Sequence, residues 1–540
     1  TVADGNISFT VTVTNTGSAA GKDVVEVYSN PPYTNGGIEK SAANLITFEK
    51  TALLQPGESE EVAISFPVDD LASYDMNVHR SYVLEAGDYI ISINKDSHNV
   101  IDSRTYTVDS DVVYDTQPRS ADNIVATNQF DFAAGDVTYL SRKDGFANYA
   151  QATAAPASLD MAPEYVEGFY TNEVFDFNMY IDDSVEMPTT GADNGLKLAD
   201  MRGKDYDDPM WEDLLDEMTV EEMSNLCGLA GFQTAEVPSI GKVATVDCDG
   251  PASINNNFTG TGSIGFPVAV MIACTWNQDL AYQFGENIGK MANEMNVNGW
   301  YAPAMNTHRT PFGGRNFEYY SEDGVLAGKI AANAVAGAKS RGVYAYIKHF
   351  AMYDSNAMMV SIWSNEQAMR EIYFKPFEYA VKEGGANAVM CAWCDIGNRW
   401  AGACSELLET VLRDEWGFRG FVLTDNFTPN GRGYMNADLA FHNDVDALLT
   451  TYDSDYNHMK DLTAASNVAT LRKTSKNILY TVVNSSAYAE DAANAGMEGW
   501  KVTAIAIDVV AVLVLAALDL TVIRKQYKKR KQATAPQKEQ

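Results

Sequence analysis

The segment from about residue 206 to residue 488 alternates short apolar strand patterns with helical patterns, and this alternation constrains the fold more than any other feature. The strand patterns occur in VNGWYAPAMN, VYAYIKHF, ANAVMCAW, RGFVLTDN and DVDALLT. One intervening helical stretch ends at the stop signal Gly384-Gly385. Such alternation predicts a parallel sheet, and about 280 residues suit a (β/α)-barrel. An open doubly wound sheet is the alternative, although no GxGxxG loop follows a strand.

Residues 1 to about 109 show a different pattern, in which apolar and polar residues alternate with a period of two. In ISFTVTV every second residue from Ile7 to Val13 is apolar. Similar runs follow between turn signals and predict a small β-sandwich. Residues 110–205 are less periodic but rich in aromatic side chains, which argues against a disordered chain. We expect a linker that packs on the neighbouring domains.

Residues 502–523 form an apolar run, VTAIAIDVVAVLVLAALDLTVI, of sufficient length to cross a bilayer as a helix. The basic run that follows predicts a single-pass protein of the cell membrane, with a cytoplasmic tail over 524–540 and the barrel outside the cell. Residues 489–501 would be a short linker. Asp508 lies deep in the run and is unfavourable there. A core or surface amphipathic helix is the alternative.

The formal net charge of −34 excludes nucleic acid as a partner and suits neutral substrates, although a solvated acidic surface without function explains it equally well. Six cysteines are few for 540 residues. Cys391 and Cys394 have CxxC spacing, but they lie in the apolar run NAVMCAW and no second pair accompanies them. We therefore expect buried strand residues, and neither a metal ion nor another cofactor.

The chemistry of the predicted barrel lies where its strands end. Reacting groups in such barrels gather at the C-terminal ends of the strands. Carboxylates and basic groups that bind hydroxyls, with aromatic rings, are typical of sugar sites. The strand ends and one connecting loop carry this combination: Asp247, Asp249, His308, Arg309, Arg315, Glu318, Glu322, Asp323, Lys348, His349, Trp393, Asp395 and Asp425.

An ordered series of motifs across this segment resembles glycoside hydrolase family 3, the β-glucosidase and β-xylosidase family. The series is DGP (249–251), FPVAVMIACTWN (266–277), APAMNTHRTPFGGRNFEYYSED (302–323), KHF (348–350), REIYFKPFE (370–378) and LRDEWGFRGFVLTD (412–425). VVEVYSNPPY and LLQPGESEEV resemble the fibronectin type III-like module of the same family. A module that precedes the barrel is similar to a circularly permuted branch, which begins with an α/β sandwich. The chain begins at Thr1 and not at Met, so we expect that sandwich upstream.

The resemblance implies a retaining, exo-acting β-glucosidase in carbohydrate catabolism, acting on a β-linked oligosaccharide or aryl glycoside without a cofactor. It makes Asp425 the nucleophile and assigns the substrate to Asp249, Arg309, Arg315, Lys348, His349 and Trp393. Each residue has a structural alternative. Asp425 could cap the next helix, Arg315 and Glu318 could form an ion pair that shapes the loop, and His349 could be a core histidine.

Several positions depart from the family pattern. In AMYDSNAMM, Asn356 and Met359 replace an acid and an arginine, and further on Asp444 stands where the family usually has Gly. The acid/base carboxylate is unknown; the resemblance places it on the upstream sandwich, and Glu318 and Asp354 are the least implausible substitutes within the chain. A membrane-tethered, carbohydrate-binding pseudoenzyme with the same fold is therefore the alternative function.

Overall fold

The computed structural model describes residues 1–166, 169, 171–256, 260–353, 360–430, 432–489 and 520–525. The chain forms two compact units, residues 1–488 and residues 489–540. Within the described part of the chain no helix has both the length and the apolar character needed to cross a bilayer. Most of the apolar run 502–523, and all but two residues of the basic tail, lie outside the described residues.

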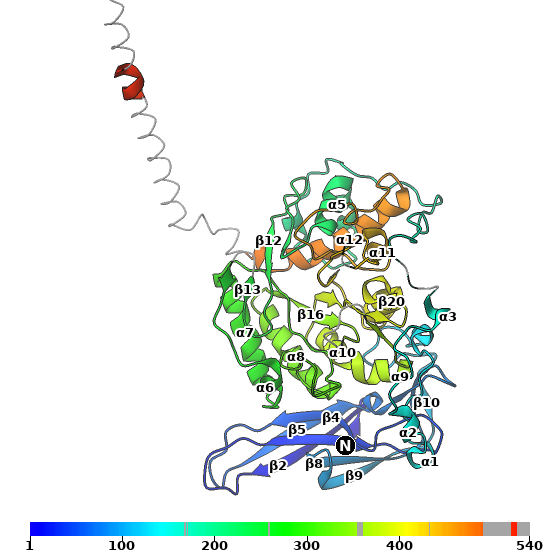
Figure 1. The fold of residues 1–540 in the computed structure, drawn as a ribbon. Coiled ribbons are helices and arrows are strands. Elements are labelled where there is room, and N and C mark those ends of the chain that lie inside the picture. Colours follow the sequence, from blue (N-terminus) through cyan, green and yellow to red (C-terminus); the bar gives the residue numbers. More distant parts are fainter. Residues whose placement is uncertain are drawn as a thin grey trace, which may run out of the picture. The chain divides into compact units, whose positions relative to one another are not determined.

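The first hundred residues form a β-sandwich of two antiparallel sheets, drawn in blue in Figure 1. One sheet has the order β1 (Val2–Ala3), β2 (Asn6–Thr14) and β5 (Ser59–Pro67). The other has the order β4 (Asn44–Lys50), β3 (Val24–Asn30), β8 (Gly87–Asp96) and β9 (Asn99–Val108). Val62, Ile64 and Phe66 alternate along β5 and are buried between the sheets. The period-two pattern therefore predicted the sandwich correctly.

A third, small sheet and several short helical turns connect the sandwich with the next domain. The sheet has the order β10 (Val112–Val113), β7 (Ser81–Leu84) and β6 (Ser73–Asp75), and η1 (Val68–Leu71) precedes it. The long connection that follows contains only η2 (Asp131–Ala133), α1 (Lys143–Phe146), α2 (Tyr149–Ala152), α3 (Pro163–Val166) and η3 (Leu198–Met201) among its described residues.

The second domain is built on a six-stranded sheet that curves into a barrel-like ring. Its order is β11 (Gln233–Thr234), β12 (Thr245–Cys248), β15 (Gly299–Trp300), β16 (Tyr344–Phe350), β18 (Ala388–Cys391) and β21 (Phe421–Leu423). Its strands run parallel from β12 onward. Leu423 bridges Ala447, and the amide of Leu448 donates to the Cys227 carbonyl at 2.9 Å. These backbone bonds join β21 to the segment before β11, which an open doubly wound sheet would not do.

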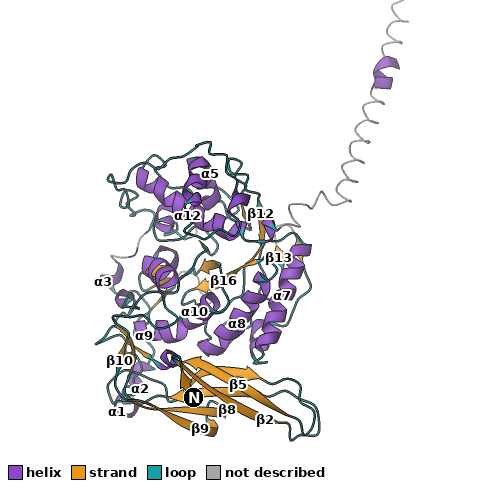
Figure 2. Cartoon of the chain, turned by 180° about the vertical axis from the view of Figure 1, so that it is seen from behind, coloured by secondary structure: helices purple, strands orange, loops and turns teal. Residues whose placement is uncertain are grey.

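Helices cover the outside of this ring, and Figure 2 shows α7 and α8 packed side by side. A Cβ on Gly285 of α7 would lie 1.9 Å from the Ala334 carbonyl oxygen, so this close approach requires glycine. The predicted stop at Gly384-Gly385 is confirmed, because α10 ends at Lys382 and Gly385 has a φ of +63°. The helices are α4 (Met210–Glu217), α5 (Val220–Gly228), α6 (Ala269–Ala273), α7 (Gln278–Glu294), α8 (Gly324–Lys339), α9 (Glu366–Ala368), η4 (Met369–Tyr373), α10 (Lys375–Lys382), η5 (Ala401–Ala403), η6 (Glu406–Glu415), α11 (Ala437–Phe441), α12 (Ala465–Val483) and η7 (Ser486–Tyr488). Short strand pairs lie in the loops: β13 (Asn255–Asn256), β14 (Thr261–Gly262), β17 (Ser361–Ile362), β19 (Asp395–Ile396) and β20 (Arg399–Trp400).

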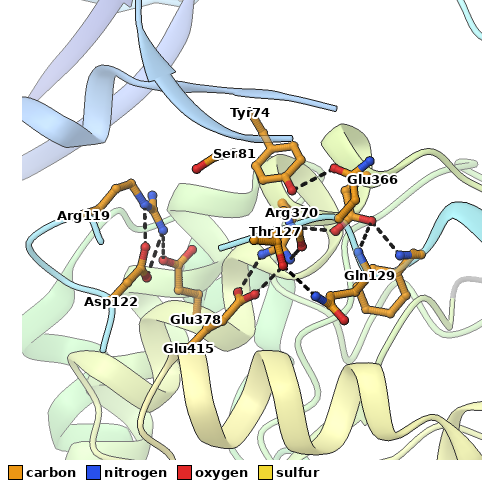
Figure 3. Close-up of polar contacts among 12 residues, drawn as sticks. Tyr74, Ser81, Arg119, Asp122, Thr127, Gln129, Glu366, Arg370, Glu378 and Glu415 are labelled. Atoms are coloured by element: carbon orange, nitrogen blue, oxygen red, sulfur yellow. Dashed lines mark hydrogen bonds and ion pairs between the residues drawn. The ribbon is translucent and has the colours of Figure 1, made fainter. Parts of the chain in front are cut away.

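The sandwich side and the barrel-like domain meet at two buried arginines (Figure 3). Arg370 of η4 donates from Nε to Glu366 at 2.7 Å and from Nη1 to Glu415 at 2.7 Å. The same guanidinium lies over the ring of Tyr74 in β6, 4.9 Å from its centroid. All three charged side chains are at most 3% exposed. Removal of one partner would leave a buried charge unpaired, so disruption of this contact is expected to be strongly unfavourable.

Arg119 makes the second buried contact, from the connection that follows β10. Its guanidinium donates to Asp122 at 2.8 Å and to Glu378 of α10 at 2.9 Å. It also stacks on Tyr82 of β7, 3.7 Å from the ring centroid. The contacts of Arg119 therefore link strand β7, the connection after β10 and helix α10 of the barrel-like domain.

Candidate active site

Some of the residues expected at the strand ends come together at one edge of the ring. Asp249 follows β12 directly, Lys348 and His349 lie near the end of β16, and Asp425 comes two residues after β21. These strands are parallel neighbours in one sheet, so their carboxyl ends share an edge. The loop between β15 and α8 adds Arg315 to the same group.

Lys348 and Asp249 form an ion pair that opens towards solvent. The Lys348 Nζ donates to Asp249 Oδ1 at 2.7 Å, and the lysine side chain is 4% exposed while the carboxylate is 43% exposed. Burial tends to raise the pKa of Asp249, but the charge of Lys348 and hydrogen bonds from Lys348 and the Gly250 amide hold this pKa below its ordinary value. The carboxylate is therefore ionised at neutral pH and keeps free acceptor capacity for a ligand hydroxyl.

His349 is a buried, neutral imidazole in this cluster. Burial, followed by the charges of Arg315 and Lys348, lowers its pKa well below the ordinary value. Arg315 Nη2 lies 3.0 Å from His349 Nε2, and the Tyr319 hydroxyl lies 3.2 Å from Nδ1. Because a guanidinium can only donate, Nε2 is the acceptor and the proton is on Nδ1.

Asp425 lies against the acceptor side of this histidine, with 3.7 Å between its Oδ2 and His349 Nε2. A neutral Nε2 has no proton to donate, so this contact is not a hydrogen bond. Burial raises the pKa of Asp425 to about 6, opposed by the Asn426 amide, Lys348, Trp393 and Arg315. The amide of Asn426 donates to Asp425 Oδ1 at 2.6 Å. One carboxylate oxygen is thus fixed by the backbone and the other faces the cluster.

Asp425 does not cap the next described helix. That helix, α11, begins at Ala437, and the side chain of Asn436 accepts the amide of Leu439 there. The geometry therefore argues against the role of a helix cap for Asp425. The structural alternative for Arg315 was an ion pair with Glu318 that shapes the loop. This pair is present, since the Arg315 Nε is paired with Glu318, which is 5% exposed. That pair orients the guanidinium towards His349 and is compatible with a binding role.

Two further predicted substrate residues, Trp393 beside Asp425 and Arg309, each lie against another side chain. The guanidinium of Arg432 lies over the Trp393 ring, 3.9 Å from its centroid, and the Tyr434 hydroxyl donates to the Trp393 carbonyl at 2.9 Å. Arg309 is exposed, contacts the Tyr373 hydroxyl and lies 5.0 Å from the centroid of that ring. The ring of Trp393 therefore has one face covered by a cation.

Two residues that were not predicted from the sequence support the cluster. The Asn306 side chain accepts from the His349 amide at 2.8 Å and donates to the His349 carbonyl at 2.9 Å. Tyr319 holds Nδ1 of the same histidine. Both are buried and lie within the run 302–323, which resembles a family motif. Their place in this motif was the sequence signal that could have predicted their role.

Other expectations concern residues away from the cluster. Cys391 and Cys394 are buried, as their apolar run predicted. Asp354, Asn356 and Met359 lie outside the described residues. Over the described ranges, no three His, Cys, Asp or Glu side chains converge as metal ligands would.

Two family profiles match the chain in the order of its domains. The fibronectin type III-like domain matches residues 23–97, and the glycosyl hydrolase family 3 N terminal domain matches residues 243–467. The chain belongs to glycosyl hydrolase family 3. Within this family it has the fibronectin-like module before the barrel-like domain, as the sequence predicted.

Beta-glucosidases are among the relatives of this family 3 chain. Beta-glucosidase A of Butyrivibrio fibrisolvens is 32% identical over 444 residues, which cover 77% of this chain and 50% of the relative. The beta-glucosidase of Ruminococcus albus is 29% identical over 428 residues, covering 78% and 43%. The beta-glucosidase structure from Paenibacillus barengoltzii superposes with a TM-score of 0.69 at 26% identity, over 90% of this chain and 54% of that chain. The chain thus spans about half the length of these relatives.

Proposed function

We propose that this chain carries the nucleophile and the sugar-binding residues of a retaining β-glucosidase-like enzyme, with Asp425 as the nucleophile. The observation that supports the proposal best is the position of the Asp425 carboxylate, 3.7 Å from a neutral histidine that Arg315 holds in place. The beta-glucosidases of Butyrivibrio fibrisolvens and Ruminococcus albus and the Paenibacillus structure support a β-glucoside as the substrate.

The proposed reaction begins with the ionised carboxylate of Asp425. One oxygen attacks the anomeric carbon, the bond to the leaving oxygen breaks, and a glycosyl ester forms on the aspartate. Water then attacks the same carbon and returns the carboxylate, so the configuration is retained. The hydroxyls of this sugar would be bound by Asp249, Lys348 and His349. Charge-assisted hydrogen bonds to them would strengthen as the ring distorts.

The acid that protonates the leaving oxygen is proposed to lie outside the described residues of this chain. Glu318 is paired with Arg315, and Asp249 is paired with Lys348 and held ionised. Asp249 therefore has no proton to give and Glu318 is engaged by Arg315, whereas a general acid must be protonated and free to reach the leaving oxygen. On this proposal the chain acts best on substrates whose leaving group needs no proton.

Covalent trapping tests the nucleophile without requiring the acid. With 2-deoxy-2-fluoro-β-D-glucosyl fluoride, the C–F bond at the anomeric carbon breaks, fluoride leaves, and the sugar forms an ester with the nucleophile. We expect the intact mass to rise by one fluoroglucosyl group, located on a peptide that contains Asp425. The Asp425→Asn variant should remain unlabelled, while Asp414→Asn, a change at an exposed acid nearby, should label normally.

Labelling on another carboxylate would overturn the assignment of Asp425. No labelling of a folded chain that still binds D-glucose would favour the alternative, a carbohydrate-binding protein without turnover. The localisation of the chain at a membrane, expected from its apolar run 502–523, is a separate proposal. Protease treatment of intact cells tests it, because it should remove the enzyme domains and leave the basic tail.

A further inference from the structure

A cavity of about 290 Å³ lies beside the β19–β20 hairpin, and its lining includes Phe132, Tyr180, Asp395, Trp400 and Tyr434. Asp395 and Trp400 are direct partners in this antiparallel hairpin, so their side chains share one face. Trp400 and Tyr434 contact each other at 5.7 Å between ring centroids. One wall is therefore aromatic, and a carboxyl group stands next to it.

The carboxyl group of Asp395 is buried without a hydrogen-bond partner for its Oδ1 among the described residues. The residue is only 2% exposed, and burial alone raises its pKa to about 8. At neutral pH the group is largely protonated, which makes it a donor through one oxygen and an acceptor through the other. Polar groups left unpaired in a protein interior are unfavourable and rare, so this one requires an explanation.

We infer that this cavity is a binding site for a single neutral sugar ring, separate from the cluster around Asp425. The Asp395 carboxyl group would exchange hydrogen bonds with ring hydroxyls, while the C–H face of the ring packs on Trp400 and Tyr434. The volume is at the small end of ligand sites and suits one ring. The inference does not depend on turnover at Asp425.

The charges at the rim favour a neutral ligand over a cation. Arg399 is paired with Glu406, and its guanidinium lies over Phe132 at 4.0 Å from the ring centroid. One aromatic face of the cavity lining is thus already covered by a cation, which would repel a second one. An anion would find the guanidinium of Arg399 already paired with Glu406. A polyhydroxy ring meets neither obstacle.

Tyr434 connects this cavity with the candidate active site. It lines the cavity, and its hydroxyl donates to the backbone carbonyl of Trp393. The side chain of Trp393 is one of the groups that lower the pKa of Asp425. A sugar ring packed on Tyr434 would therefore contact the residue whose hydroxyl holds the backbone of Trp393. A free monosaccharide is the occupant that a cavity for one ring fits, and its identification as a released product rests on the proposed function.

The first test locates the ligand directly. Crystals of the full chain with the Asp425→Asn change are soaked with methyl 1-seleno-β-D-glucopyranoside, and anomalous data are collected at the selenium edge. We expect a selenium peak in the cavity, within contact distance of Trp400 or Tyr434. A peak only at the Asp249–Lys348 pair, or no peak at all, would overturn the inference.

The second test separates binding from folding by titrating D-glucose calorimetrically into variants of the same chain. Asp395→Leu should weaken binding in the cavity about tenfold, the range expected for the loss of a hydrogen bond. Its melting temperature should not fall, because an unpaired buried carboxyl group is removed. Asp395→Asn keeps a donor and an acceptor and should bind within about twofold of the parent.

Glu371→Gln is the matched control, because Glu371 is another buried acid, with a pKa raised to about 7 by burial, at the contact with Tyr74 of the sandwich side. This variant should leave glucose binding unchanged. Equal binding by the Asp395→Leu variant and its parent would overturn the inference. Failure of covalent trapping at Asp425 would leave both tests unaffected, so the two proposals can fail independently.

Discussion

Replacement of Asp425 by Asn should remove hydrolysis and at the same time stabilise the protein above pH 6. Burial raises the pKa of this carboxyl group from 3.8 to about 6. A shift of about two units corresponds to about 3 kcal/mol, at about 1.4 kcal/mol per unit. This is the amount by which the ionised side chain disfavours the folded state when the pH is well above 6. Asn has the same shape and no charge to bury.

The sign follows from the protons bound by each state. Between pH 3.8 and pH 6 the folded protein keeps a proton on Asp425 that the unfolded chain has lost. The free energy of unfolding therefore falls as the pH rises through this window, and the full penalty is present above it. We expect urea unfolding at pH 8 to show the Asp425→Asn variant more stable than the parent by up to about 3 kcal/mol. At pH 4 the difference should largely disappear.

Asp249→Asn provides a control with the opposite sign. The pKa of Asp249 is held low by Lys348, so its ionised form favours the folded state at neutral pH, and the variant should be less stable than the parent at pH 8. Both variants should lose activity on nitrophenyl β-glucoside. The reasoning would be refuted if Asp425→Asn gave no gain in stability at pH 8, or if the two variants shifted stability in the same direction.

Three further results are expected. The kcat/KM on nitrophenyl β-glucoside should fall as the pH drops through about 6, since protonation of Asp425 removes the nucleophile; a profile unchanged down to pH 5 would contradict this. The chain alone should cleave activated aryl glucosides far better than cellobiose, and efficient cleavage of cellobiose would show that it contains the acid. Arg370→Met leaves Glu366 and Glu415 buried without their partner and should lower the free energy of unfolding by about 3–5 kcal/mol in urea titrations. The exposed Arg104→Met control should lower it by less than about 1 kcal/mol, and equal losses would argue against the buried network.

The position of the candidate site could be predicted from sequence because it depends on local rules. A parallel strand ends where its apolar run ends, so the residues after it lie at a common edge. Asp249 directly follows β12 and Asp425 comes two residues after β21, while Lys348 and His349 lie within β16 near its carboxyl end. Period-two alternation fixed the sandwich for the same reason, since each strand shows its buried face within a few residues.

The supporting contacts could not be predicted because they join residues far apart in the chain. Arg370 meets Glu415 across 45 residues, and no local pattern records that pairing. REIYFKPFE resembles a family motif, yet in this structure its Arg370 and Glu378 face the sandwich side. Asp444, which stands where the family usually has Gly, keeps the left-handed backbone with a φ of +71°. Asp adopts this conformation more readily than most residues, so the departure changes the side chain without changing the turn.

The two buried arginines also bear on how such a protein can be rearranged by recombination. A different fibronectin-like module grafted onto this barrel would have to supply its own partners for Arg370 and Glu371, because Tyr74 now covers the first and donates its amide to the second. The connecting segment would have to travel with it, since Arg119 pairs with Glu378 on the barrel side and stacks on Tyr82. The fibronectin-like module, the connecting segment and the barrel-like domain therefore depend on one another's contacts. Functional chimaeras are expected only from crossovers that keep all three together.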